Sequence, residues 1–193
     1  MILYDTNGDN MNIFYLDKCP KQCAEWMVNR HVVKMILETA QLLCTAHRVL
    51  DGTMYYDKTK TGRRVKRWRL SDPMMESTLY KATHVNHPST VWCRENNENY
   101  LWLYEHFVQL LSEYKYRYNK NHKCEMFIDV LKQAPKNIKQ EAFFDPPSAM
   151  DNEYKIGSDS IVNYRNYYIY GRARMHSWKK RSPPEWITRN EII

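Results

Sequence analysis

Apolar residues between Pro20 and Val49 recur every three or four positions, which is the spacing of one face of an α-helix. Pro20 suits the first turn of such a helix and Gly52 suits its end. We therefore predict a helix from about Pro20 to Val49. It should be central and covered on almost all sides, because apolar residues occupy a main face and continue round the back: Val28, Val32, Met35, Ile36, Leu42, Leu43 and Ala46, then Val33, Leu37, Ala40 and Cys44.

The remaining pattern predicts shorter elements around this helix. We expect a strand from Met11, a basic β-hairpin over 53–70, a second long helix over about Ser89–Asn119, a short helix that stops at Pro135, and a last helix after a cap at Ser158 or Asp159. A second hairpin is expected at Asn7-Gly8. The long polar loop after Pro135 is of a kind that is often functional where it covers a site.

These elements predict a mainly α protein: a single compact domain, residues 1–193, around a long central helix with one or two small β-hairpins. Residues 53–70 form a basic hairpin insertion in it, and residues 158–193 form a basic aromatic C-terminal segment. Because Met11 stands at the start of a predicted strand, residues 1–10 are interpreted as a possible upstream extension.

A polar stripe runs along one edge of the central helix. Steps of three and four place these side chains together: His31, Lys34, Glu38, Gln41 and Thr45. We predict Glu38 and His31 as acid or base, Lys34 as nucleophile or phosphate ligand, and Gln41 as a substrate contact. The alternative is a solvent-facing stripe in which Lys34 and Glu38 merely pair.

A second candidate lies just before the helix that Pro88 opens. His84, Asn86 and His87 precede it, and the free N–H groups of a helix N-terminus suit a phosphate. We predict that these three residues bind phosphate or substrate, or that they form only a cap and turn. A zinc pair at His84 and His87, or at Cys19 and Cys23, is a weaker alternative, so no metal is expected.

The net charge of +7 and the pI of about 9.1 favour a polyanionic partner, and nucleic acid is the commonest one. Cations alternate with aromatic residues in two patches, as in nucleic-acid grooves. The hairpin patch holds Arg63, Arg64, Lys66, Arg67 and Trp68, and the C-terminal patch holds Arg165, Arg172, Arg174, Lys179 and Lys180. DNA rather than RNA is the expected partner, although both patches have the alternative of packed aromatics with solvated charges.

Other observations exclude several classes. The chain has five cysteines without a C-x-x-C pair and shows no signal peptide, which predicts free thiols and the cytoplasm. No Walker or G-x-G-x-x-G loop occurs, which argues against an ordinary ATPase or dinucleotide enzyme, and no cofactor is expected. No apolar run approaches a membrane span, so we expect no membrane partner.

The order of these motifs resembles an uncharacterised family of tailed phages. The segments that carry the resemblance are "MNIFYLD", "RHVVKMILETAQLLCTAHRVLDG", "THVNHPSTVW" and "YRNYYIYGRARMHSWKKRSPPEW". More distantly, the layout is similar to the phage pyrimidine-dimer DNA glycosylases of the endonuclease V type. That resemblance implies a helical DNA repair enzyme in which an N-terminal α-amine, helped by a glutamate on the first helix, attacks the sugar.

The chain departs from that pattern because it offers Met1-Ile2 or Met11-Asn12 where the family has Met-Thr. Glu38 is the available carboxylate, and Lys34 can replace the α-amine by forming a Schiff base. We therefore expect a DNA glycosylase/lyase, in a host cytoplasm if a phage encodes it. The target base would be flipped, with aromatics such as Trp68 as a wedge. The alternatives are a non-enzymatic nucleic-acid-binding factor and a small-molecule enzyme of nucleotide metabolism.

Overall fold

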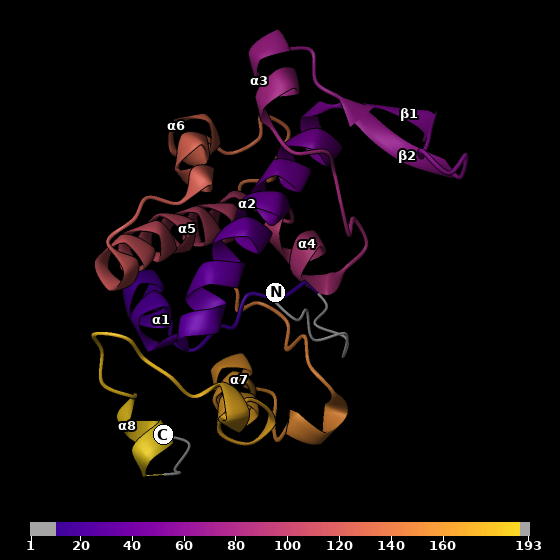
Figure 1. Cartoon of the computed structure of the whole chain (residues 1–193). Coiled ribbons are helices and arrows are strands. Elements are labelled where there is room, and N and C mark those ends of the chain that lie inside the picture. Colours follow the sequence, from indigo (N-terminus) through magenta and orange to yellow (C-terminus); the bar gives the residue numbers. More distant parts are fainter. Residues whose placement is uncertain (1–10, 190–193) are drawn as a thin grey trace.

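Helices dominate the structure, a computed structural model that describes residues 11–189 (Figure 1). The hairpin expected at Asn7-Gly8 lies outside these residues. The elements are α1 (Pro20–Trp26), α2 (Asn29–Asp51), β1 (Thr53–Lys58), β2 (Arg64–Arg69), α3 (Pro73–Thr78), α4 (Pro88–Cys93), α5 (Asn97–Tyr118), the 3-10 helix η1 (Lys123–Phe127), α6 (Ile128–Leu131), the 3-10 helix η2 (Asn152–Tyr154), α7 (Ser160–Asn166), the π-helical turn η3 (Tyr167–Gly171), the 3-10 helix η4 (Ala173–Met175) and α8 (Glu185–Thr188).

The single helix predicted over Pro20–Val49 is wrong in one respect, because it is broken into α1 and α2. Met27 and Val28 are extended, with ψ angles of 139° and 153°, and both side chains are fully buried. The carbonyl groups that the break leaves open are bound by the buried guanidinium of Arg117 on α5. Its Nη1 donates to the carbonyl oxygen of Met27 and its Nη2 donates to that of Glu25, each at 2.8 Å.

The second predicted helix is also divided, here into α4 and α5. Arg94 ends α4, and Asn96 caps α5 by accepting a hydrogen bond from the backbone N–H of Asn99 at 2.8 Å. An asparagine cap interrupts a helix because its side chain replaces a backbone acceptor. Helix α5 packs against both α1 and α2, and this contact forms the centre of the hydrophobic core.

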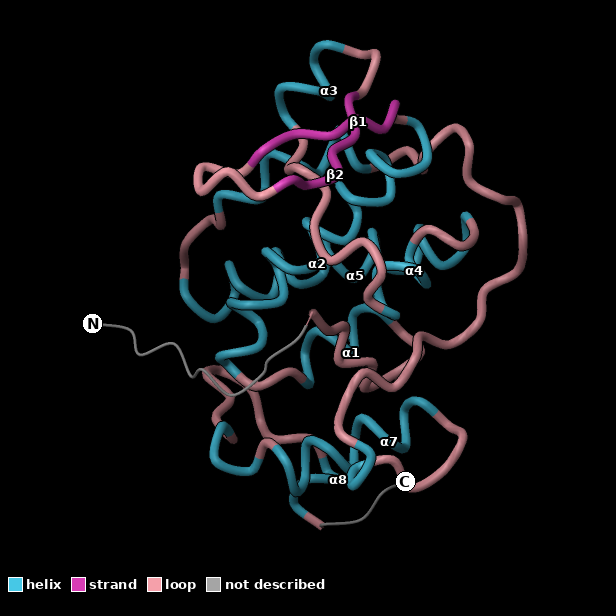
Figure 2. Tube along the Cα trace, turned by 90° about the vertical axis from the view of Figure 1, so that its right-hand side faces the viewer, coloured by secondary structure: helices cyan, strands magenta, loops and turns pink. Residues whose placement is uncertain are grey.

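The basic hairpin is confirmed. Strands β1 and β2 are antiparallel, with Thr53 opposite Arg69 and Lys58 opposite Arg64, and they extend away from the helices (Figures 1 and 2). Gly52 joins α2 to β1 at a point without space for a side chain, since an added Cβ would lie 2.4 Å from the carbonyl oxygen of Arg48. The hairpin is the only sheet within the described part of the chain.

The C-terminal part is built from short turns. Asp159 caps α7, as predicted, and accepts a hydrogen bond from the backbone N–H of Val162 at 3.0 Å. The strand predicted from Met11 is not formed: residues 11–16 are buried but contain a tight turn at Asn12, and Phe14 has a left-handed φ of 54°. The whole is a single compact, mainly α domain, as the sequence predicted. Across residues 11–189, no helix has the length and apolar character needed to cross a membrane.

Candidate active site

Glu38 lies in the middle of α2 and binds two nitrogen atoms. Its Oε1 is 3.1 Å from Nζ of Lys34, one turn earlier, and its Oε2 accepts a hydrogen bond from the backbone N–H of Asn12 at 3.2 Å. The Glu38 side chain is 12% exposed, whereas that of Lys34 is 30% exposed. An almost buried carboxylate is therefore paired with an amine that a ligand can reach.

Asn12 connects Glu38 to the rest of the site. Its Oδ1 accepts hydrogen bonds from the backbone N–H groups of Ile13 and Phe14, so the side chain closes a tight turn. Its Nδ2 donates to the carbonyl oxygen of Ala149 at 2.7 Å. The start of the described chain is thus fixed between α2 and the loop that follows Pro147.

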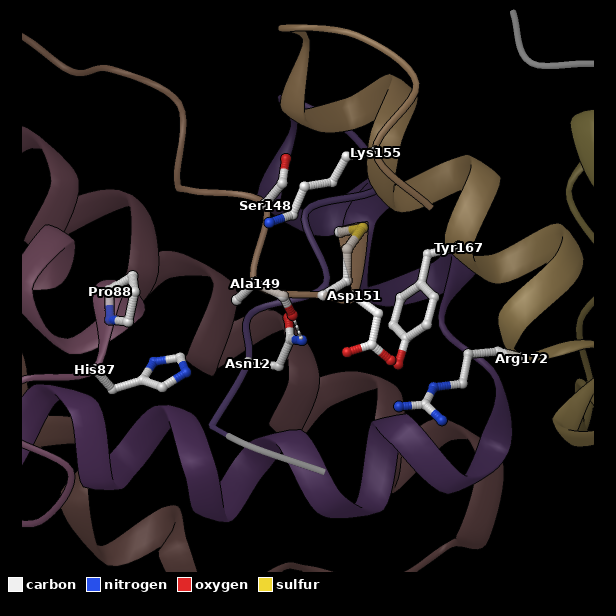
Figure 3. Close-up of a pocket in the computed structure, with 10 residues that line it drawn as sticks. Asn12, His87, Pro88, Ser148, Ala149, Asp151, Lys155, Tyr167 and Arg172 are labelled. Carbon is white, nitrogen blue, oxygen red and sulfur yellow. Dashed lines mark hydrogen bonds between the residues drawn. The ribbon is translucent and has the colours of Figure 1, made fainter. Parts of the chain in front are cut away.

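A cavity of about 350 Å³ opens beside Asn12 (Figure 3). Its walls come from segments that lie far apart in the sequence: the Asn12 turn, the first residues of α4, the loop before η2, and η3 with the residue after it. The lining residues are Asn12, His87, Pro88, Ser148, Ala149, Met150, Asp151, Lys155, Tyr167 and Arg172. Such a volume is at the lower end of the range for pockets that bind small ligands.

His87 is the residue of the predicted His84–His87 turn that reaches this cavity. Its Nδ1 accepts a hydrogen bond from the backbone N–H of Ser89 at 3.2 Å, so the ring caps α4. Burial lowers the pKa of His87, and nearby His84 lowers it further. The neutral ring then carries its proton on Nε2, where it can donate to a ligand oxygen.

His84 and Asn86 lie on the exposed side of the same turn and do not line the cavity. Nδ1 of His84 is 2.9 Å from Oγ1 of Thr83, and its backbone has a φ of 47°. Thr45 binds this turn to α2, because its hydroxyl accepts a hydrogen bond from the backbone N–H of Thr83 at 3.2 Å. Gln41 is half-buried between Glu38 and Thr45.

His31 is enclosed by aromatic residues. Its ring stacks on Phe14 at a centroid distance of 3.9 Å, and its Nδ1 lies 2.5 Å from Oη of Tyr168. Burial holds the pKa of His31 well below its usual range, and Arg172, Lys34 and Arg30 lower it further. These contacts favour a residue that positions η3 against α2 over the predicted acid or base, since Phe14 and Tyr168 enclose the ring.

The predicted basic residues occupy different environments. In the hairpin, Arg63, Arg64 and Lys66 are exposed, while Arg67 and Trp68 are half-buried. In the C-terminal patch, Arg172 lines the cavity and lies over the ring of Tyr167 at 4.6 Å. Arg174, Lys179 and Lys180 are exposed, and Nζ of Lys180 donates to the carbonyl oxygen of Tyr116.

Arg165 lies inside the protein and away from solvent. Its side chain is 12% exposed, its Nε donates to the carbonyl oxygen of Leu16 at 3.1 Å, and its guanidinium lies 5.1 Å from the ring centre of Trp26. These contacts give Arg165 a packing role in the free protein, and little of its side chain is exposed to DNA.

The sequence did not single out Asn12, Ser148, Asp151 or Lys155 as site residues, although all line the cavity. The only available signal was the long loop after Pro135, which was expected to be functional if it covered a site. Within residues 11–189, no three His, Cys, Asp or Glu side chains gather closely enough to hold a metal ion. Cys23 is buried, and its Sγ is hydrogen-bonded to the backbone of Leu16 and Phe14.

The fold and the cavity together define a small, basic, mainly helical protein in which the cavity residue Asn12 connects a polar pocket to an amine–carboxylate pair that does not itself line the pocket. The model of the family described as pyrimidine dimer DNA glycosylase matches residues 11–126, which is more than half of the chain. The protein belongs to this family, and the resemblance inferred from its sequence is confirmed. No curated protein and no solved structure matches the chain.

Family membership supports a function of the DNA glycosylase type, with DNA as the partner. The matched residues include Asn12, Lys34, Glu38, His87 and the hairpin. The cavity residues from Ser148 to Arg172 lie outside the matched range, so seven of the ten lining residues come from the part of the chain beyond it.

Proposed function

We propose that the protein is a DNA glycosylase/lyase whose reaction takes place between the Lys34–Glu38 pair and the adjoining cavity. The observation that carries this proposal is the distance of 3.1 Å between Nζ of Lys34 and Oε1 of Glu38, on the helix that the family model covers. A glycosylase must take its target base out of the stack, and the cavity offers a volume for that base.

Lys34 is the proposed nucleophile because it is the amine that the chain offers beside this carboxylate. The family resemblance implies an α-amine, and the nitrogen of Asn12 does lie next to Glu38. In the full chain, however, that nitrogen belongs to a peptide bond and is not nucleophilic. A chain processed to begin at Asn12 would present an α-amine there. Mapping of the protein–DNA adduct distinguishes this alternative from attack by Lys34.

The proposed chemistry uses these groups in sequence. The Lys34 ammonium gives a proton to Glu38, and the free amine attacks C1′ of the flipped nucleotide. The bond from C1′ to nitrogen forms as the bond from C1′ to the base breaks, and the departing base nitrogen takes the proton that Glu38 received. Opening of the sugar ring gives an imine, loss of a proton from C2′ to a base breaks the C3′–O bond and releases the 3′ phosphate, and water then hydrolyses the imine and frees Lys34.

The surrounding side chains have supporting roles. His87, as a neutral donor at the cavity wall, is proposed to bind an oxygen of the base or phosphate. Arg172 and Lys155 bring positive charge to the cavity for the phosphates on either side of the target. Gln41, His84 and Asn86 remain proposed substrate or phosphate contacts along the approach from α2 and α4.

The test is base excision from duplexes that carry one pyrimidine dimer or one abasic site, with undamaged duplex as reference. The native protein is expected to release the base or cleave the strand, and Lys34→Ala is expected to lose this activity with unchanged folding. Lys21→Ala, an exposed lysine on α1, is the matched control. DNA binding without cleavage of either damaged duplex would contradict the proposal and favour the non-enzymatic alternative.

A further inference from the structure

The hairpin contains almost all of the excess positive charge of the chain. Residues 53–69 hold seven cations and one carboxylate, which gives +6 against +7 for all 193 residues. Across the described part of the chain, none of these seven cations lies within ion-pair distance of a carboxylate. The charge is therefore available to a polyanion outside the protein.

One face of the hairpin presents this charge together with an aromatic ring. The pairing places Tyr56 opposite Lys66 and Lys58 opposite Arg64, so these four side chains share a face. Tyr56 is 51% exposed, and the guanidinium of Arg64 lies 3.5 Å above its ring centre. A two-stranded ribbon of this kind has dimensions that enter the major groove of B-form DNA.

The root of the hairpin is fixed to the helical body by Arg48 of α2. Its Nη1 donates to the carbonyl oxygen of Trp68 at 3.1 Å, and the same guanidinium pairs with Glu76 of α3. Its Nη2 donates to the carbonyl oxygen of Leu79 at 2.7 Å. Because Trp68 lies at this root and is half-buried, Tyr56 is the aromatic residue that the hairpin exposes to a partner.

The hairpin is distant from the Lys34–Glu38 pair but connected to it by a rigid element. Thirteen residues of α2 separate Glu38 from Asp51, which corresponds to about 20 Å along the helix axis. With one base pair per 3.4 Å of duplex, this distance spans about six base pairs. In Figure 1 the hairpin and α4, which begins at the cavity, lie on the same side of α2.

We propose that the hairpin is a second DNA-binding element, which binds intact duplex about six base pairs to one side of the target base. The face formed by Tyr56, Lys58, Arg64 and Lys66 contacts the major groove and its phosphates. This inference rests on the proposed function only for the position of the target base. The affinity of the hairpin for undamaged duplex does not depend on any reaction at Lys34.

The first experiment measures the salt dependence of binding to undamaged duplex DNA. The test variant combines Lys58→Gln, Arg64→Gln and Lys66→Gln, which keeps the side chains long and removes three charges. The slope of log affinity against log salt is expected to fall by about 2.7, since each phosphate contact contributes about 0.9. The matched control replaces three exposed lysines outside the hairpin, between the end of α5 and the residue after α6, and is expected to keep the native slope: Lys120, Lys123 and Lys132.

The second experiment locates the contact. Duplexes carry one unreactive tetrahydrofuran abasic site, and the arm on each side is shortened in turn from about 15 base pairs to about 4, less than the span along α2. The native protein is expected to lose at least about tenfold in affinity when one particular arm is shortened, whereas the triple variant loses little. If the triple variant unfolds, a double variant at the tip of the hairpin, Lys60→Gln with Arg63→Gln, allows the same measurement.

Three results would overturn the inference. The first is an unchanged salt slope in the triple variant, and the second is an equal loss of affinity when either arm of the duplex is shortened. The third is an affinity for duplex RNA equal to that for duplex DNA, since the narrow major groove of RNA excludes a β-ribbon. The salt slope is measured on undamaged duplex, so it tests the hairpin even if the protein excises no base. The two proposals can therefore fail separately. Absence of excision by the native protein, together with a reduced salt slope in the triple variant, would contradict the proposed function alone.

Discussion

The backbone nitrogen of Asn12 lies 3.2 Å from Oε2 of Glu38, although 26 positions separate the two residues. This hydrogen bond fixes the start of the described chain against the middle of α2. It also leaves Oε1 of the same carboxylate for Lys34. Glu38 therefore binds the amine of Lys34 and the backbone of the cavity residue Asn12, and its charge is the property on which the proposed reaction depends.

Replacing Glu38 by glutamine tests that charge with little change in shape. Glu38→Gln is expected to bind damaged duplex nearly as well as the native protein, and to excise the base about 10² to 10⁴ times more slowly, since proton transfer to a positioned side chain contributes that much. Single-turnover excision kinetics measure the effect. Glu95→Gln, an exposed position after α4, is the matched control, and native rates in Glu38→Gln would contradict the assignment.

Buried histidines predict a loss of stability in mild acid. Burial lowers the pKa of His47 and of His106 to about 4, and it lowers that of His31 well below 6.5. Because the unfolded chain binds more protons than the folded one below pH 6.5, stability is present above that pH and is lost as the pH falls toward about 4. For His106 alone, a shift of this size corresponds to about 3 kcal/mol.

The measurement is urea unfolding between pH 7.5 and 4.5. His106 is the simplest position to vary, because its Nδ1 donates to the carbonyl oxygen of Pro20 at 3.0 Å and an asparagine amide can replace that contact. His106→Asn is expected to show a shallower loss of stability with falling pH than the native protein. An identical pH profile in both proteins would contradict the prediction.

The break between α1 and α2 depends on Arg117, which is fully buried. Its Nε donates to Oε1 of Glu113 at 2.6 Å, and its other nitrogens bind the open carbonyl groups of Glu25 and Met27. Arg117→Ala is expected to lower the free energy of unfolding by about 3 to 5 kcal/mol, since it leaves Glu113 with Arg181 as its remaining ion-pair partner and removes the donor to the carbonyl groups of Glu25 and Met27. Lys115→Ala, an exposed change on the same helix, should stay within about 0.5 kcal/mol of the native value.

Tyr168 and Tyr170 form a natural pair for testing how η3 is attached to α2. Oη of Tyr168 lies 2.5 Å from Nδ1 of His31 and is buried, whereas Tyr170 is 59% exposed. Tyr168→Phe is expected to lower the free energy of unfolding by about 1 to 3 kcal/mol, because it removes the partner of a buried imidazole nitrogen. Tyr170→Phe is expected to have no effect, and equal unfolding curves for both variants would show that this hydrogen bond does not stabilise the attachment.

Local pattern predicted the helices, the hairpin and the cap at Asp159, because each is encoded by neighbouring residues. The break at Met27 and Val28 was missed since neither residue opposes helix, and the arginine that stabilises the break lies 89 positions beyond Val28. The break before α5 had a local signal in Asn96, which can cap a helix.

In the candidate site, too, some features follow from local sequence and others arise only in the folded chain. The edge formed by Lys34, Glu38 and Thr45 follows from helical spacing and was predicted. The turn at Asn12 and the cavity residues Asp151 and Tyr167 meet that edge only through the tertiary fold, so spacing along the chain carried no signal for them. His31 has the correct spacing but a different environment, because Phe14 and Tyr168 enclose it.

Trapping of the proposed imine is the most direct test of the central claim. The native protein is incubated with an abasic duplex and sodium borohydride, and the linked peptide is identified by mass spectrometry. We expect a covalent protein–DNA adduct on Lys34, which the Lys21→Ala variant forms and the Lys34→Ala variant does not. An adduct on the nitrogen of Asn12 in a shortened chain, or excision by Lys34→Ala without any adduct, would contradict it.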